Sequence, residues 1–167
     1  MEQLEWGYLY TIALCAMAFV SFSIIALVLQ QSAGRSITKL HIYRMRQYIE
    51  SGLVAVAFAL LPPLLAILGL PLLTVWRVSS ATIALFLIVW LALFPSRRRS
   101  RVKGPIPTQV VVFTALWVPI LVWLLANAFA NEPNGSSVVL AATWRLTSVA
   151  LIFFISLDEF LAGSSRR

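Results

Sequence analysis

The chain alternates between long apolar runs and short polar or basic segments. Five runs are almost free of charged residues, and they lie at about 8–29, 48–68, 71–94, 108–129 and 137–161. A helix needs about 20 apolar residues to cross the hydrocarbon core of a bilayer. The pattern therefore predicts an all-α membrane protein with five transmembrane helices, in which residues 1–167 form a single transmembrane domain.

Helix breakers define how the runs are joined. Gly69 and Pro71 separate the second run from the third, which predicts an antiparallel hairpin with almost no loop. Pro62 and Pro63 lie inside the second run, and Pro119 lies inside the fourth. Proline removes a backbone donor and clashes with the carbonyl four residues earlier, so we expect a kink at both places.

Outside the apolar runs, basic residues occur on only one side of this five-helix arrangement. A basic segment at 35–47 follows the first run, a basic loop at 95–107 follows the third, and Arg166 and Arg167 follow the fifth. The positive-inside rule then predicts that the N-terminus is outside and the C-terminus cytoplasmic. We expect a multi-pass protein of the cytoplasmic (inner) membrane.

The segment 35–47 alternates apolar and basic residues at roughly helical spacing. This spacing favours an amphipathic helix on the cytoplasmic membrane surface, with its basic side toward anionic lipid headgroups. The candidate headgroup-binding residues are Arg35, Lys39, Arg44 and Arg46. The alternative is that they are ordinary positive-inside charges without a specific lipid ligand.

One five-residue pattern occurs twice. Residues 76–80 and 144–148 both read Trp-Arg-aliphatic-hydroxyl-Ser, and each copy opens an apolar run that follows a run containing proline. We therefore expect the second and third helices to form a hairpin that repeats in the fourth and fifth. Both hairpins begin and end in the cytoplasm, so the predicted repeat is parallel, about an axis along the membrane normal.

The repeat places Arg77 and Arg145 at similar depth, with Arg145 somewhat deeper. Lipid offers a guanidinium no partner, so each arginine needs one within the protein. One interpretation is an outward-facing ligand-binding site for an anion or polar headgroup, formed by Arg77 and Arg145 with Ser80 and Ser148. The alternative is structural, with both arginines reaching headgroup phosphates or binding carbonyls freed at the kinks.

The last helix carries a stripe of polar residues. Ser156 and Glu159 fall on about the same helical face as Arg145 and Ser148, which predicts a polar path along the span. The alternative for Glu159 is an ion pair with the basic loops.

Composition narrows the function class. Apolar residues make up 60% of the chain and charged residues 11%. The charged residues behind the net charge of +7 cluster between the apolar runs, which argues against a nucleic-acid partner. His41 and Cys15 are the single residues of their types, so we expect no metal site and no disulfide within the chain. No catalytic or cofactor-binding motif occurs, and we expect no enzyme activity and no cofactor.

Two functions fit these observations best, and a third, a lipid-modifying enzyme, fits them least because no residues are identified to carry its chemistry. The first is a small channel- or transporter-like protein for an ion or a small polar or anionic solute, active as a homo-oligomer because five helices of this composition enclose little polar space. The second is a non-catalytic structural or accessory subunit of a larger membrane complex, binding lipid headgroups or a partner helix. In both cases the expected partners are membrane lipids, anionic on the cytoplasmic face.

Overall fold

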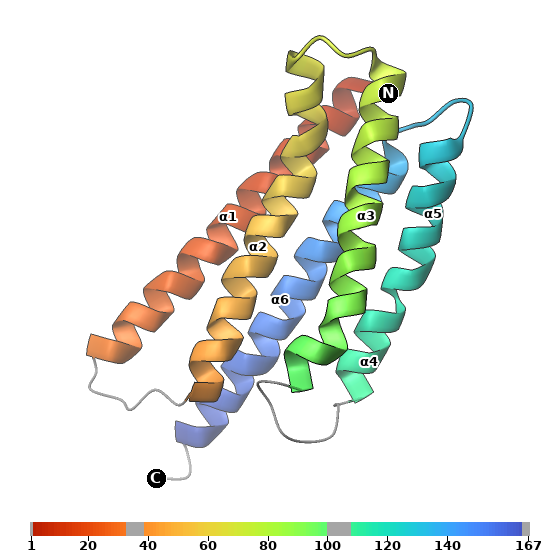
Figure 1. Cartoon of the computed structure of the whole chain (residues 1–167). Helices are drawn as coiled ribbons and strands as arrows, with labels where there is room; N and C mark the ends of the chain where they lie inside the picture. The colour runs from red at the N-terminus through yellow and green to blue at the C-terminus, as the bar shows by residue number, and fades with distance from the viewer. Residues whose placement is uncertain (1, 33–38, 100–107, 165–167) are drawn as a thin grey trace.

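A computed structural model describes residues 2–32, 39–99 and 108–164, which form six α-helices and no β-strand. The helices are α1 (Glu2–Ser32), α2 (Lys39–Ile67), α3 (Leu72–Arg99), α4 (Thr108–Ala115), α5 (Trp117–Phe129) and α6 (Ser136–Ser164). This confirms the predicted all-helical class. Because α4 and α5 follow each other across the single residue Leu116, the six segments make five rods (Figure 1).

The prolines act differently in the two places where a kink was expected. The break between α4 and α5 falls at Leu116, three residues before Pro119. This is expected, because proline has no N–H to donate to the carbonyl four residues earlier. In contrast, α2 continues as one helix through Pro62 and Pro63, which are both buried.

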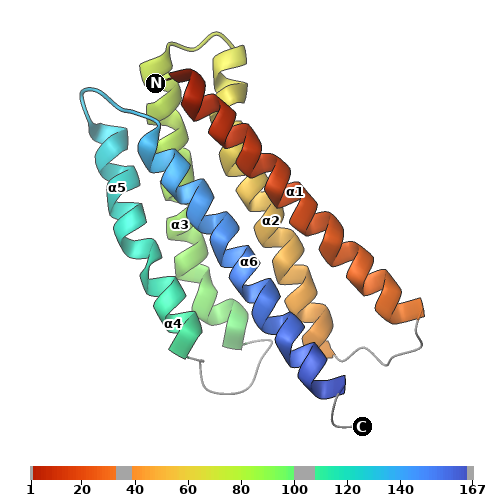
Figure 2. The ribbon, with the colours of Figure 1, turned by 180° about the vertical axis from the view of Figure 1, so that it is seen from behind.

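The helix ends are sorted between two ends of the bundle. The start of α1, the turn between α2 and α3, and the loop between α5 and α6 lie together at one end, which we call the turn end (Figures 1 and 2). The end of α1, the start of α2, the end of α3, the start of α4 and the end of α6 lie at the opposite end. The predicted basic loop at 95–107 begins later than expected, because α3 continues through Pro95 to Arg99, and residues 100–107 lie outside the described part of the chain.

The turn between α2 and α3 is as short as predicted. Between the end of α2 and the start of α3, Gly69 has φ 80° and donates its N–H to the Ala66 carbonyl at 2.9 Å. A left-handed residue after a helix end is strongly favoured to be glycine, because it has no Cβ to clash with the backbone.

The segment before the second apolar run differs from the expected surface helix. From Lys39 onward the chain is already α2, with no break at residue 48. No glycine or proline interrupts residues 39–48, so the helix simply extends toward its N-terminus. Residues 35–38 lie outside the described part of the chain.

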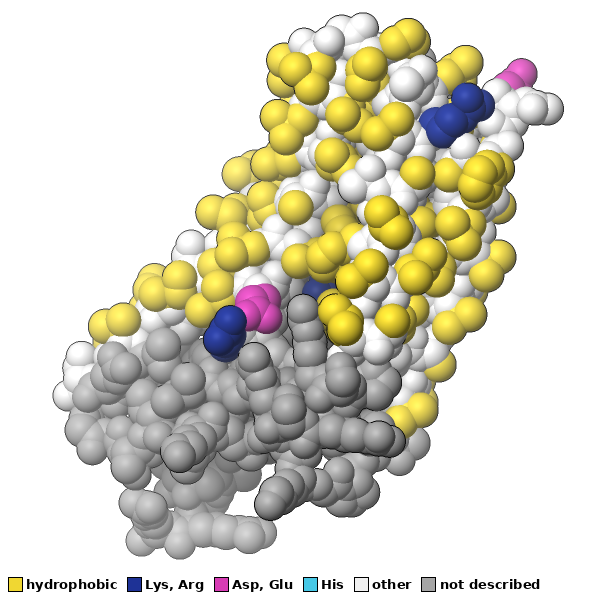
Figure 3. Space-filling model, viewed as in Figure 1, with side chains coloured by type: hydrophobic (Ala, Val, Ile, Leu, Met, Phe, Trp, Pro, Cys, Tyr) yellow, Lys and Arg dark blue, Asp and Glu magenta, His cyan; other side chains and the backbone are white. Residues whose placement is uncertain are grey.

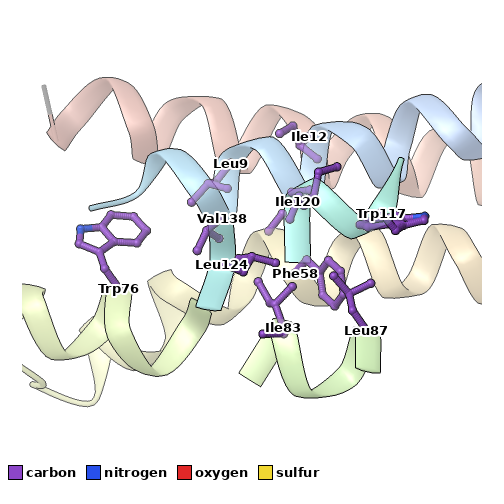
Figure 4. Packing of buried hydrophobic residues seen from close by; sticks show 14 of the residues in the cluster. Leu9, Ile12, Phe58, Trp76, Ile83, Leu87, Trp117, Ile120, Leu124 and Val138 are labelled. Carbon is purple, nitrogen blue, oxygen red and sulfur yellow. The ribbon is translucent and has the colours of Figure 1, made fainter. Parts of the chain in front are cut away.

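The helices pack unequally. α2 packs most extensively on α1 and α6, whereas α3 packs most extensively on α5. Close contact between α1 and α2 depends on small residues, because Ala16 on α1 and Ala55 on α2 are fully buried and Gly52 faces Val20. The apolar core continues along the bundle interior from Trp76 near the turn end to Trp117 and Leu87 (Figure 4).

Within the part of the chain that the structure describes, three helices are long and apolar enough to cross a membrane, over Glu5–Ile25, Arg46–Ile67 and Leu72–Leu93. Two shorter apolar stretches, Trp117–Phe129 and Ser136–Leu151, belong to the remaining rods. Much of the described surface is hydrophobic (Figure 3), including Leu14, Ile67 and Phe129, which are all more than 70% exposed. An apolar surface of this extent suits lipid rather than water, so the chain has the character of a membrane protein.

Candidate functional site

Arg145 is the one charged side chain that is buried among the described residues. It extends from α6 toward α2, α3 and α5, and only 5% of it is exposed. Its Nη2 donates a hydrogen bond to Oγ of Ser51 on α2, at 3.3 Å. This distance is beyond the usual range for an N–H···O bond, so the serine is a weak partner for a full positive charge.

Two tryptophans provide the aromatic part of this environment. The Cζ atom of Arg145 lies 5.2 Å from the ring centroid of Trp90 on α3 and 5.7 Å from that of Trp117 on α5. Both distances are within the range of cation–π attraction. We call Arg145, Ser51, Trp90 and Trp117 the Arg145 site, since four helices each supply one of its members.

The guanidinium in this site is poorly satisfied. Nε of Arg145 is buried and has no hydrogen-bond partner. A buried donor without a partner costs about 1–3 kcal/mol, and more when the group is charged. The Arg145 site therefore has spare hydrogen-bonding capacity for a group that carries negative charge.

Ser148 lies beside the Arg145 site but contributes its hydroxyl elsewhere. It is buried one turn further along α6, and its Oγ donates to the Trp144 carbonyl at 2.7 Å. Serine hydroxyls in helices commonly bind the carbonyl four residues earlier. Ser148 is therefore close to the predicted ligand position in the sequence, with its donor already used.

Arg77 is not part of the same site. Its side chain is exposed at the turn end, where Nη2 donates to the Ala130 carbonyl at 3.0 Å. Arg77 is five residues after Leu72 at the start of α3, whereas Arg145 is nine residues after Ser136 at the start of α6. The four additional residues place Arg145 about 6 Å deeper in the bundle, so the expected pairing of the two arginines is not found.

Ser80 belongs to a separate group of polar residues near the turn end. Its Oγ accepts a hydrogen bond from Nδ2 of Asn127 at 2.9 Å and lies 3.3 Å from Oγ of Ser137. Asn127 also binds the backbone of Asn134. We call Ser80, Asn127, Asn134 and Ser137 the turn-end polar cluster, which joins α3, α5, α6 and the loop between the last two.

An apolar layer separates the turn-end polar cluster from the Arg145 site. Ser80 and Trp90 are ten residues apart on α3, and Asn127 and Trp117 are ten residues apart on α5, which corresponds to about 15 Å along each helix. The interior between these levels is filled by buried apolar side chains (Figure 4): Ile83, Leu87, Ile120, Leu124, Ala141 and Ala142.

Other predicted positions lie outside what the structure describes. Ser156 and Glu159 fall within α6, but their side chains are not described, so the polar path beyond Ser148 stays a prediction. Arg35 is outside the described residues, as are the side chains of Lys39 and Arg44. Arg46 is exposed and its Nε donates to Glu50 Oε1 at 2.6 Å, one turn along α2.

Sequence reasoning did not identify four of the residues that matter most here. Asn127 is a single polar residue inside an apolar run, and that interruption was the available signal. Ser51, Trp90 and Trp117 resemble ordinary residues of membrane helices, and only the packing of α2, α3 and α5 brings them to Arg145.

Among the described residues, no group of three or more His, Cys, Asp and Glu side chains is placed to hold a metal ion. Comparison of the chain with protein-family models, with curated proteins and with solved structures finds no match.

Proposed function

We propose that the chain is a multi-pass protein of the cytoplasmic membrane, channel- or transporter-like, that binds a small anion at the Arg145 site. The observation that carries this proposal is the buried, incompletely paired guanidinium of Arg145. A guanidinium has five N–H donors; among the described residues Nε has no partner and Nη2 has a long hydrogen bond to Ser51.

The position of this charge supports a binding role. Burial of an unpaired ion costs several kcal/mol, and charged residues within membrane helices are typically found where ions or substrates bind. The cation–π contacts with Trp90 and Trp117 lower this cost, and Nε has no hydrogen-bond partner among the described residues. The site thus stabilises the arginine while its donors stay available for an anion.

The apolar layer fits a protein that opens in order to release its ligand. An anion that moves from Arg145 toward the turn end would cross the level of Leu87 and Leu124 before it met the polar side chains of Ser80 and Asn127. Apolar constrictions of this kind close many membrane pathways to ions and water. We therefore interpret the described arrangement as a closed state.

Helix pairing supports the predicted parallel repeat. A two-fold axis along the bundle would exchange the hairpin α2–α3 with the hairpin of α4, α5 and α6, and it would relate the α2–α6 contact to the α3–α5 contact. These two contacts are comparably extensive. In this interpretation, the two copies differ in where the helix begins: α3 starts closer to its Trp-Arg pair than α6 does.

A second candidate is the non-catalytic accessory subunit of a larger membrane complex. The close packing of Ile83, Leu124 and Ile120 in the interior favours it, since a subunit needs no path. In that case the guanidinium of Arg145 would be paired by an acidic side chain of a partner protein.

The test is anion binding and flux with purified protein in phosphatidylcholine bilayers. We expect wild-type protein in nanodiscs to bind acetate or inorganic phosphate in titration calorimetry, and proteoliposomes to transport that anion. Arg145→Gln should abolish both activities, whereas Arg77→Gln should retain them, because Arg77 lies outside the site. If the glutamine variant does not fold, Arg145→Lys is measured instead, and it should weaken binding and flux without abolishing them, because lysine keeps the charge and loses the bidentate geometry.

The outcomes separate the two candidates. Anion binding that Arg145→Gln abolishes in a folded, correctly assembled protein supports the proposal. Unchanged binding and flux in that variant contradict it. The accessory-subunit function is favoured if the folded wild-type protein binds no anion and is recovered from its native membrane only with a partner chain. Light scattering of the purified protein tests the expected homo-oligomer.

A further inference from the structure

The arrangement of donors in the Arg145 site indicates what kind of anion it takes. Nε and Nη2 of a guanidinium lie on the same edge and point their N–H groups in parallel. Among the described residues, Nε of Arg145 has no hydrogen-bond partner and Nη2 makes the 3.3 Å contact with Ser51. Both donors of one edge are thus available at once.

We propose that the anion is an oxyanion, a carboxylate or a phosphate, whose two oxygens accept from Nε and Nη2 of Arg145. This inference rests on the proposed function. Two parallel N–H groups match the spacing of two oxygens on one carbon or phosphorus atom, and each such charge-assisted bond is about twice as strong as a neutral one. A halide presents a single centre and gains only one well-aligned bond from this edge.

The tryptophans stabilise the charge while Nε stays unpaired. Cζ of Arg145 lies over the rings of Trp90 and Trp117 within cation–π distance, so both rings offset the cost of burying the guanidinium. Among the described residues, Nε beside these rings has no hydrogen-bond partner. A ligand therefore contacts Arg145 through its directional N–H donors.

Ser51 supplies a third donor. Its Oγ accepts from Nη2, so the hydroxyl hydrogen can point at an oxygen held on the same edge. Because the contact is already 3.3 Å, a ligand oxygen can displace it with little loss. A hydroxyl beside the two parallel N–H donors of Arg145 favours an anion that has more than one acceptor oxygen.

Such an oxyanion has two possible sources. A lipid headgroup provides a phosphodiester, and the aqueous phase provides free carboxylates and phosphate. Both present the same pair of oxygens to Nε and Nη2, so the chemistry of recognition is shared and only the experiment separates the sources.

The test compares anions of equal charge on the whole protein in phosphatidylcholine nanodiscs. Acetate, dihydrogen phosphate at pH 6 and chloride are titrated by calorimetry, with a thermal-stability measurement in parallel. We expect the oxyanions to bind about tenfold more tightly than chloride, since they gain one further charge-assisted hydrogen bond. Arg145→Lys should bind all three anions with affinities within about threefold of each other, because an ammonium lacks the two parallel N–H donors of a guanidinium.

A matched variant tests the third donor. Ser51→Ala should weaken acetate and phosphate several-fold and leave chloride nearly unchanged, because it removes a hydroxyl and keeps the guanidinium. Equal weakening of all three anions would mean that Ser51 only positions the arginine, which would contradict its role as a donor.

The source is resolved by lipid composition. The ligand is a lipid headgroup if phosphatidylglycerol in the nanodiscs stabilises wild-type protein but not Arg145→Lys. In that case phosphatidylglycerol also competes with acetate. Binding of acetate or phosphate that phosphatidylglycerol does not affect identifies a free solute. Both results support an oxyanion.

The inference and the proposed function fail in different ways. Chloride that binds as tightly as acetate and phosphate, with all binding lost in Arg145→Gln, overturns the oxyanion inference and leaves the anion site intact. No binding of any anion by folded wild-type protein overturns the proposed function itself.

Discussion

Asn127 holds the backbone of Asn134 with both ends of its side-chain amide. Its Nδ2 donates to the Asn134 carbonyl at 2.9 Å, and its Oδ1 accepts from the Asn134 N–H at 3.1 Å. The same Nδ2 also donates to Ser80 on α3. One side chain near the end of α5 thus fixes the course of the loop before α6 and joins that loop to α3.

Replacement of Asn127 should loosen the turn end. In Asn127→Ala the buried Ser80 hydroxyl and the partly buried backbone bonds of Asn134 lose a partner, at a cost of about 1–2 kcal/mol. We expect a lower midpoint of thermal unfolding for the protein in detergent. Asn131→Ala is the control, because Asn131 is exposed in the same loop. Equal midpoints for the two variants would show that the amide contributes nothing to stability.

The hydrophobic pattern predicted the rods of this fold because the number of residues needed to cross a membrane is a property of the helix itself. The short turn after α2 and the break before Pro119 were also predictable, because glycine and proline act on their own stretch of backbone. Local chemistry at these places determines the outcome. The same rule did not predict α2, which continues as one helix through Pro62 and Pro63.

The environments of the two arginines were not predictable in the same way. Arg77 and Arg145 have nearly identical neighbours in the sequence, yet one is exposed and the other is buried. The difference arises from how far each lies from its helix start and from which other helices reach it. Partners of Arg145 come from α2, α3 and α5, and a single-sequence pattern carries no information about such tertiary contacts.

Membrane orientation can be tested with reporter fusions. We expect a reporter placed after Arg167 or inserted near Ser100 to be active as a cytoplasmic fusion, and one inserted near Asn134 to be active outside, because the basic segments share one side of the predicted arrangement and the positive-inside rule makes that side cytoplasmic. Alkaline phosphatase and green fluorescent protein report the two sides in opposite ways. A cytoplasmic signal from the Asn134 position would contradict the five-span arrangement.

Trp117 should matter far more to stability than Trp123 on the same helix. Trp117 is 2% exposed and lies against the guanidinium of Arg145, whereas Trp123 is 48% exposed. Trp117→Leu loses buried volume and a cation–π contact, so we expect a loss of about 2 kcal/mol or more. Trp123→Leu should change the unfolding midpoint little. A larger loss in Trp123→Leu would indicate that this face is buried in an assembly.

The contact of α1 with α2 is limited by the absence of a side chain at Gly52. A methyl group there would overlap Cγ2 of Val20, which is itself buried. Gly52→Ala should therefore destabilise the protein by about 1–3 kcal/mol through overpacking, although alanine is the better helix former.

A second substitution makes this prediction specific to the contact. Val20→Ala removes the overlapping methyl group, so the double variant Gly52→Ala/Val20→Ala should be more stable than the sum of the single losses predicts, with a coupling of about 1 kcal/mol. Gly7→Ala is the control, because a methyl group at Gly7 meets nothing within 4 Å, and it should be neutral or stabilise α1 by up to about 1 kcal/mol. Additive losses for Gly52 and Val20 in thermal unfolding would show that the two helices separate to relieve the clash.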